Sequence, residues 1–148
     1  MSDLSLNSLY QQLILDHYRK PRNKGELPEK TIEIHMNNPV CGDEIRLQLQ
    51  IEDNVIVDAR HVGHGCSISQ ASVSMMTNLL KGKPLEEAEG LAARFTAMMH
   101  GDEGPARDKT MGDLRALQGV SKFPVRIKCA LLAFDTLQEA IKKTKAGE

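Results

Sequence analysis

The sequence of 148 residues has little of what several classes of protein require. It contains no tryptophan and only 3% aromatic residues, so it offers few side chains on which nucleic-acid bases would stack. The formal net charge of −1 gives no general attraction to polyanions. No apolar run is long enough to cross a membrane, and the first residues lack the basic and then apolar pattern of a signal peptide. We therefore expect a cytoplasmic protein that binds neither nucleic acid nor membranes.

Cysteine is also scarce, with three residues in the whole chain: Cys41, Cys66 and Cys129. An odd number fits poorly with the paired disulfides of small secreted domains, and it favours a reducing compartment. The simplest alternative is that all three are buried, inert, small hydrophobic residues. Their sequence neighbours decide between that alternative and a chemical role.

The remaining composition is that of a globular protein, with 41% hydrophobic and 26% charged residues. The length is sufficient for one domain with a substantial core, and we predict a single domain over residues 1–148. We find no internal repeat and no linker that would divide it.

Alternating apolar and polar residues predict three strands, over residues 31–36, 44–52 and 55–60. The turn pair Asp53-Asn54 predicts a hairpin between the second and third strands. In the third strand we expect Val55, Val57 and Ala59 to share one face. Apolar spacing of three and four residues predicts helices around this sheet. They cover residues 6–17, 68–79, 84–99 and 124–141, with a short helix over 110–118. Ser67 and Gln70 suggest a capping box. The predicted fold is α+β in two layers, an antiparallel three-stranded sheet covered by helices.

Each cysteine lies at a boundary between predicted elements. Cys41 stands with Asp43 in the turn between the first two strands. Cys66 follows Gly63-His64-Gly65 and precedes a helix, whose N-terminus favours a thiolate. Cys129 lies early in the last helix, where the neighbouring Arg126 and Lys128 also favour a thiolate. It is offset from the main apolar stripe, so it need not lie deep in the core.

Three thiols and the Asp43 carboxylate are enough for a closed tetrahedral zinc site, and soft thiolates also suit iron–sulfur chemistry. The spacing alone does not identify the metal. His64 is the alternative to Asp43 as fourth ligand, and His61 and His35 are weaker candidates. We expect His17 to be a satisfied, half-buried side chain without a ligand role.

Four segments resemble the U-type iron–sulfur cluster assembly proteins. They are Leu9–Asn23, Asn38–Asp43, Gly65–Ser69 and Arg126–Cys129, and the resemblance extends over nearly the whole chain. Isc-type scaffold members of the family carry a histidine just before the third cysteine, where this chain has Lys128. They also carry a Leu-Pro-Pro-Val-Lys chaperone-binding loop, where this chain has residues 121–125, and a shorter connection between the second and third cysteines. In these differences the chain resembles the Suf-system (SufU) branch of the family.

The resemblance to that branch implies a zinc ion held by Cys41, Asp43, Cys66 and Cys129. It also implies a partner, a SufS-type cysteine desulfurase that contains pyridoxal phosphate. Cys41 would accept persulfide sulfur from this enzyme and relay it to a downstream iron–sulfur assembly scaffold, so that the chain acts as a sulfurtransferase-like accessory protein that activates the desulfurase. Two alternatives remain open: a scaffold on which a [2Fe–2S] cluster is assembled, and a zinc-stabilised interaction module without turnover.

Overall fold

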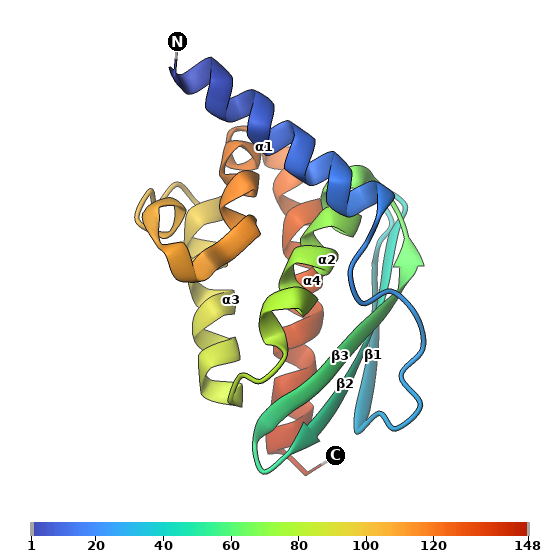
Figure 1. Cartoon of the computed structure of the whole chain (residues 1–148). Helices are drawn as coiled ribbons and strands as arrows, with labels where there is room; N and C mark the ends of the chain where they lie inside the picture. The colour runs from blue at the N-terminus through green and yellow to red at the C-terminus, as the bar shows by residue number, and fades with distance from the viewer. Residues whose placement is uncertain (1, 148) are drawn as a thin grey trace.

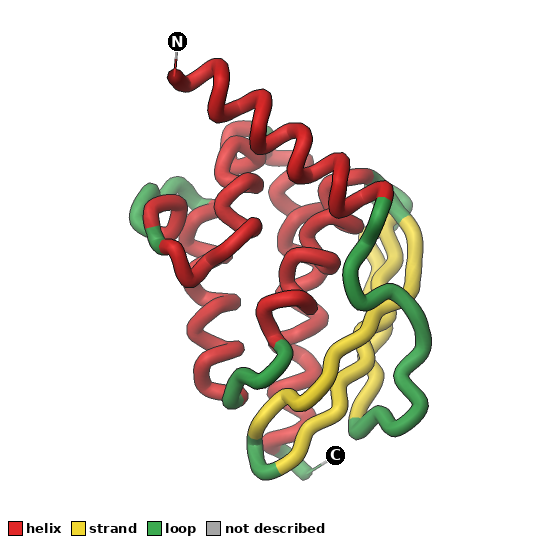
Figure 2. Tube along the Cα trace, viewed as in Figure 1, coloured by secondary structure: helices red, strands yellow, loops and turns green. Residues whose placement is uncertain are grey.

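The computed structural model describes residues 2–147, with side chains from residue 8 onward. Helix α1 precedes a sheet of three strands, and helices make up the second half (Figures 1 and 2). The elements are α1 (Ser2–Arg19), β1 (Ile32–Asn38), β2 (Asp43–Glu52), β3 (Val55–His64), α2 (Ser67–Leu80), α3 (Leu85–Met99), the 3-10 helices η1 (Pro105–Arg107) and η2 (Lys109–Lys122), and α4 (Pro124–Lys145). The predicted α+β class is confirmed. None of the helices described is both long and apolar enough to cross a membrane.

The sheet is an antiparallel meander in the order β1-β2-β3. Asp53 and Asn54 join β2 to β3 with φ angles of 52° and 63°. Two successive positive φ values define the type of turn that matches the twist of a hairpin, and Asn and Asp tolerate them better than most residues. The predicted hairpin is confirmed.

The inward face of β3 differs from the prediction. The pairing of β2 with β3 shifts by one residue between Gln50 and Ile51, which leaves Val57 outside the register. Such a bulge reverses the alternation on one side of it. Ile56 and Ala59 are therefore fully buried, whereas Val57 is 41% exposed. The expectation that Val55 and Val57 share the face of Ala59 is wrong.

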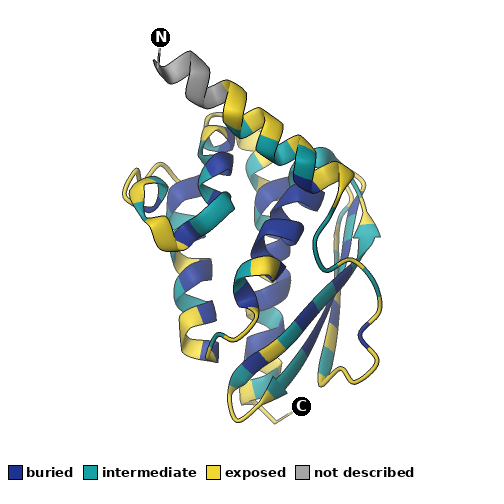
Figure 3. Ribbon diagram, in the orientation of Figure 1, coloured by how far each residue is buried: buried dark blue, intermediate teal, exposed yellow. Residues whose placement is uncertain are grey.

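Helices α2 and α4 cover one face of the sheet, with α4 against β1 and β2 and α2 against β3 (Figure 1). Leu47 and Leu49 point from β2 into this layer and are fully buried. Complete burial of one such leucine contributes about 1.5–3 kcal/mol. Phe95 of α3 stacks on Phe134 of α4, with ring centroids 4.3 Å apart, and so extends the core behind the first helical layer. Figure 3 shows buried residues along the facing sides of sheet and helices.

Two helix boundaries also differ from the sequence prediction. Helix α2 is capped by Cys66 rather than by Ser67, because the Cys66 sulfur accepts the Ser69 N–H. The predicted short helix over 110–118 is a longer 3-10 segment, Lys109–Lys122, that bends at Gly112 (φ 54°) and continues through Gly119. Only glycine adopts this backbone conformation at low cost.

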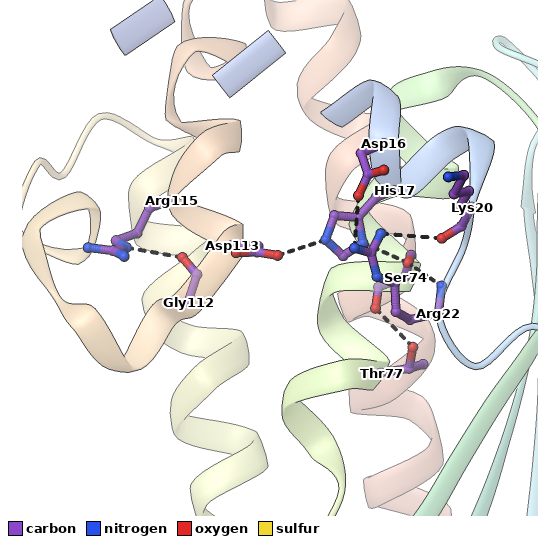
Figure 4. Close-up of polar contacts among 9 residues, drawn as sticks. All are labelled: Asp16, His17, Lys20, Arg22, Ser74, Thr77, Gly112, Asp113 and Arg115. Carbon is purple, nitrogen blue, oxygen red and sulfur yellow. Dashed lines mark hydrogen bonds and ion pairs between the residues drawn. The ribbon is translucent and has the colours of Figure 1, made fainter. Parts of the chain in front are cut away.

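His17 connects three helical segments through its two ring nitrogens (Figure 4). Nδ1 lies 2.7 Å from Ser74 Oγ of α2, and Nε2 lies 2.8 Å from Asp113 Oδ2 of η2. The Arg22 backbone N–H donates to the same Ser74 hydroxyl at 2.8 Å. His17 is fully buried, deeper than expected, and the prediction of a satisfied side chain is confirmed. These bonds tie α1 to the layer beneath it.

Candidate metal centre

Cys41 lies in the tight turn that joins β1 to β2. Its backbone N–H donates to the carbonyl of Asn38 at 3.2 Å, which closes the turn. Gly42 follows with φ 69°, a left-handed conformation that lets the chain enter β2 at once. The neighbouring Val40 is 78% exposed, and Cys41 itself is half-buried. This turn therefore presents the Cys41 thiol at the edge of the sheet.

Asp43 is the first residue of β2 and is almost completely buried, at 1% exposure. Its Oδ1 accepts the Cys66 backbone N–H at 2.8 Å, and its Oδ2 lies 3.8 Å from Cys66 Sγ. A Cβ at position 65 would overlap Asp43 Oδ1, so only glycine allows the approach of the two chains. A buried carboxylate needs such partners, because burial without them is costly.

Cys66 ends the connection from β3 and begins α2. Its sulfur accepts the Ser69 N–H at 3.5 Å, as the N-cap of the helix. Its backbone N–H is held by Asp43, so both ends of the residue are constrained. The thiol is half-buried, beside the carboxylate and over the positive end of the helix dipole.

Cys129 closes the site from the side of the helices. It lies in the second turn of α4 and is fully buried, although it is offset from the main apolar stripe of that helix. Its Sγ lies 2.9 Å from Cys41 Sγ. Burial raises the pKa of the Cys129 thiol, and hydrogen bonds with Cys41 and Asp43 raise it further. Arg126 and Lys128 are exposed, so the expected stabilisation of a thiolate by these two cations is outweighed by burial.

Cys41, Asp43 and Cys129 thus form a group whose ligand atoms all lie within 4.8 Å of one another. Cys66 adjoins this group through Asp43. The set combines three sulfurs with one carboxylate oxygen, a donor set suited to zinc and other thiophilic metals. The Asp43–Cys66 hydrogen bond and the Gly65 contact bring these groups together without a metal, so the residues present fit a metal centre.

His64 lies on the opposite face of the sheet from Asp43. It pairs with Glu44 across the β2–β3 ladder, and residues that face each other in a ladder point to the same side. Its Nε2 lies 4.0 Å from Glu44 Oε1, and its side chain is 75% exposed. Because Glu44 and Asp43 are adjacent in one strand, their side chains point in opposite directions. The structure therefore places Asp43, and not His64, beside the thiols.

The other histidines named from the sequence are also occupied elsewhere. His35 lies 3.4 Å from Glu44, on the same outer face as His64. His61 is buried, and its Nε2 lies 2.9 Å from the carbonyl oxygen of Arg22. Burial lowers the pKa of His61 from 6.5 to about 4. Within residues 8–147, no histidine joins the group formed by Cys41, Asp43 and Cys129.

Sequence reasoning did not identify the part that Ser69 plays in the site, as donor to the Cys66 sulfur. The spacing of three residues from an N-cap to a backbone donor would have suggested it if Cys66 had been considered as the cap. It also did not foresee the bond between Asp43 and the Cys66 backbone, which depends on the register of β2 with β3.

Known proteins with the same sequence pattern give an independent assignment. The chain matches the NifU-like N terminal domain family over residues 9–147. It is 48% identical over 143 residues to the zinc-dependent sulfurtransferase SufU of Bacillus subtilis (strain 168). This alignment covers 97% of this chain and 96% of the relative. It is 45% identical over 139 residues to the iron–sulfur cluster assembly scaffold protein IscU of Streptococcus pyogenes serotype M1, with coverage of 94% and 86%.

A solved structure gives the same result. The crystal structure of a putative iron–sulfur cluster assembly scaffold protein for the SUF system, from Fervidobacterium islandicum AW-1, superimposes with a TM-score of 0.78 at 32% identity. The match covers 88% of this chain and 94% of the other. Sequence and fold thus agree with the resemblance expressed by the four segments around the cysteines. The chain belongs to the NifU-like N-terminal domain family of iron–sulfur cluster assembly proteins.

Proposed function

We propose that this protein is a zinc-dependent sulfur acceptor in iron–sulfur cluster biogenesis. It takes persulfide sulfur from a SufS-type cysteine desulfurase on Cys41 and relays it to a downstream assembly scaffold. One observation carries the proposal: three thiols converge on one buried carboxylate, and one of these thiols lies on an exposed turn. The zinc-dependent sulfurtransferase of Bacillus subtilis, at 48% identity, supports the same role.

Cys41, Asp43, Cys66 and Cys129 would hold the zinc ion. Bound there, zinc keeps the coordinating thiols deprotonated at neutral pH. The buried Asp43 carboxylate supplies an oxygen and a negative charge, and its bond to the Cys66 N–H fixes its orientation. The Cys66 sulfur is oriented in turn by the Ser69 N–H. These contacts orient the Asp43 and Cys66 donor atoms before the metal ion binds.

Cys41 is the thiol best suited to accept sulfur. Cys129 is fully buried, and the Cys66 sulfur is engaged as the cap of α2. Cys41 is half-buried on a turn whose neighbour Val40 is 78% exposed, so a partner is able to approach it. Its thiolate attacks the terminal sulfur of the partner's persulfide. The new S–S bond forms on Cys41 while the old one breaks, and the partner's cysteine leaves as a thiolate.

A second function is favoured by the relative of Streptococcus pyogenes, which is named as a scaffold and is 45% identical. In that case the same thiols would hold a [2Fe–2S] cluster during its assembly, since thiolates are the usual ligands of such clusters. The two functions use the same residues, which would hold zinc and transferred sulfur in the first function and a [2Fe–2S] cluster in the second.

Elemental analysis and sulfur transfer together distinguish the two. Protein purified without air is analysed for zinc and iron, and then incubated with a cysteine desulfurase and cysteine. The sulfur-acceptor function predicts tightly bound zinc, faster cysteine turnover and persulfide on the protein. A visible-absorbing cluster that moves intact to an apo-protein, with no increase in cysteine turnover, would establish the scaffold function instead.

A further inference from the structure

A groove of about 600 Å³ lies beside the thiols, between α1, η2 and the beginnings of α2 and α4. Figure 1 shows α1 crossing over this part of the molecule. The walls are mainly apolar, formed by Tyr10, Ile14, Ile68, Ala116, Val120 and Phe123. Phe123 is 62% exposed although it is among the largest apolar side chains in the chain. An exposed aromatic residue on the edge of an apolar groove is typical of a recognition surface.

The charge on this groove has one sign. Lys122 and Arg126 contribute to its lining, and no carboxylate does so among the side chains of residues 8–147. Within the same residues neither cation forms an ion pair, although eight ion pairs of Lys or Arg with carboxylates occur elsewhere in that part of the chain. Ser67 and Ile68 also bring the first turn of α2, the positive end of its dipole, to the groove. The complementary ligand is therefore apolar and negatively charged.

We propose that this groove is the docking site for an acidic, apolar segment of a partner protein. Apolar side chains of the segment occupy the space between Ile14, Ile68 and Val120, and its carboxylates face Lys122 and Arg126. A helix or extended strand laid into an apolar groove with charges at its rim is a common mode of peptide recognition. The volume falls within the range of protein ligand sites.

The groove is adjacent to the thiol centre through two lining residues. Ser67 directly follows Cys66, and Arg126 lies one helical turn before Cys129. A partner segment bound here would hold the rest of the partner next to Cys41. The inference goes beyond the proposed function, and its test uses no sulfur chemistry, so each is able to fail without the other.

Short random peptides displayed on phage, selected on the full chain under reducing conditions, test the inference. The expected enriched sequences combine apolar or aromatic residues with Asp or Glu. One enriched peptide is then synthesised with a fluorescent label, together with a copy in which Lys replaces each acidic residue. Fluorescence anisotropy is expected to show binding of the acidic peptide and at least about tenfold weaker binding of the Lys copy.

Two variants remove the two properties of the groove separately. A Cβ at Gly119 meets no atom within 4 Å, so Gly119→Leu fills the groove without disturbing the backbone. Lys122→Glu reverses one of the two charges on an exposed side chain. Each variant is expected to bind the acidic peptide at least about tenfold more weakly than the unchanged chain. Matched controls on α4, Gln138→Leu and Lys143→Glu, lie outside the groove and are expected to change binding less than about twofold.

Lys122→Glu is also expected to strengthen binding of the Lys copy, because the new carboxylate attracts its lysines, and loss of folding would not produce this gain. Three results would each overturn the inference: no enrichment of any peptide, enrichment of sequences without carboxylates, or equal weakening by the groove variants and their controls.

Discussion

Asp43 is the residue on which the geometry of the centre depends. It is the charged member of the group, it is buried, and it bonds the backbone of Cys66. Asp43→Asn keeps the size of the side chain and an oxygen for the Cys66 N–H while it removes the negative charge. We predict at least about tenfold weaker zinc binding in this variant, measured by competition with a chromophoric chelator.

Glu44→Gln is the matched control, because residue 44 is adjacent in the strand and faces the opposite side of the sheet, toward His35 and His64. Its zinc affinity is expected to equal that of the unchanged chain. Equal affinity in Asp43→Asn and Glu44→Gln would show that the carboxylate is not a ligand.

The cysteines also show what sequence reasoning reaches at the scale of the residue. Their positions at element boundaries, with Gly42 beside Cys41 and Gly65 beside Cys66, favoured one shared site, although the spacing alone did not establish it. Their environments were not predictable in the same way. The exposure of Cys129 depends on how α4 packs on β1 and β2, and this packing buries a residue that lies outside the main apolar stripe of its helix.

At the scale of the element, the β-bulge decides whether His64 lies on the same face of the sheet as Asp43. Without a bulge, the hairpin at Asp53-Asn54 would pair Asp43 with His64 and turn both to the same face. The one-residue shift between Gln50 and Ile51 instead pairs Glu44 with His64 and sends the imidazole to the outer face. The alternating sequence of β2 and β3 contains no signal for this shift. The ambiguity between Asp43 and His64 in the sequence therefore has a definite structural cause.

The helices also have features that their sequence periodicity does not predict. Apolar periodicity predicted α1, α2, α3 and α4 within a few residues. The predicted stripes of α2, α3 and α4 are largely buried, whereas Leu9 in the stripe of α1 is 57% exposed. It did not predict the length of η2, whose bend at Gly112 depends on a left-handed backbone conformation rather than on periodicity. It also placed the cap of α2 at Ser67, because serine is a common capping residue and cysteine is not.

His17 provides a test of how α1 is held to the other helices. His17→Ala removes a fully buried ring and its contacts with Ser74 and Asp113. We expect the free energy of unfolding to fall by about 2–4 kcal/mol, because the change combines a cavity with the loss of buried hydrogen bonds. Urea denaturation measures this loss.

His100→Ala is the comparison variant. The His100 side chain is exposed and interacts with the Thr96 carbonyl at 2.9 Å within its own helix region. Its replacement is expected to change the free energy of unfolding by less than about 0.5 kcal/mol. If His17→Ala were no more destabilising than His100→Ala, the His17 bonds would not hold α1 in place.

At the scale of the whole molecule, His61 makes stability depend on pH. Burial between β3 and the helices keeps its pKa at about 4, compared with 6.5 for an ordinary histidine. Between these two values the unfolded chain binds a proton at this residue and the folded chain does not. The neutral His61 therefore contributes about 3 kcal/mol to the free energy of unfolding. This contribution is complete above pH 6.5 and is lost as the pH falls to about 4.

Urea denaturation at a series of pH values measures this dependence, and His61→Gln isolates it from the titration of the carboxylates. The glutamine amide keeps a donor for the Arg22 carbonyl and has no titratable group. We expect a flatter profile of stability against pH in the variant across this interval. An unchanged slope would mean that His61 does not remain neutral in the folded protein.

The proposed transfer of sulfur from another protein also concerns the whole molecule, and the three thiols are not equivalent for it. Cys41 is on an accessible turn, Cys66 caps a helix, and Cys129 is buried. A partner therefore reaches one sulfur before the others. We therefore propose that Cys41, and neither Cys66 nor Cys129, is the first sulfur acceptor.

Peptide-resolved mass spectrometry, after incubation with a cysteine desulfurase and cysteine, identifies which cysteine accepts the sulfur. We predict one added sulfur atom on the peptide that contains Cys41, and none on the same peptide of Cys41→Ser. Folding of Cys41→Ser is verified by its unfolding midpoint, because the residue lies in a turn outside the core. Added sulfur on Cys66 or Cys129 with Cys41 unmodified, or none on any of the three, would show that Cys41 is not the sulfur acceptor.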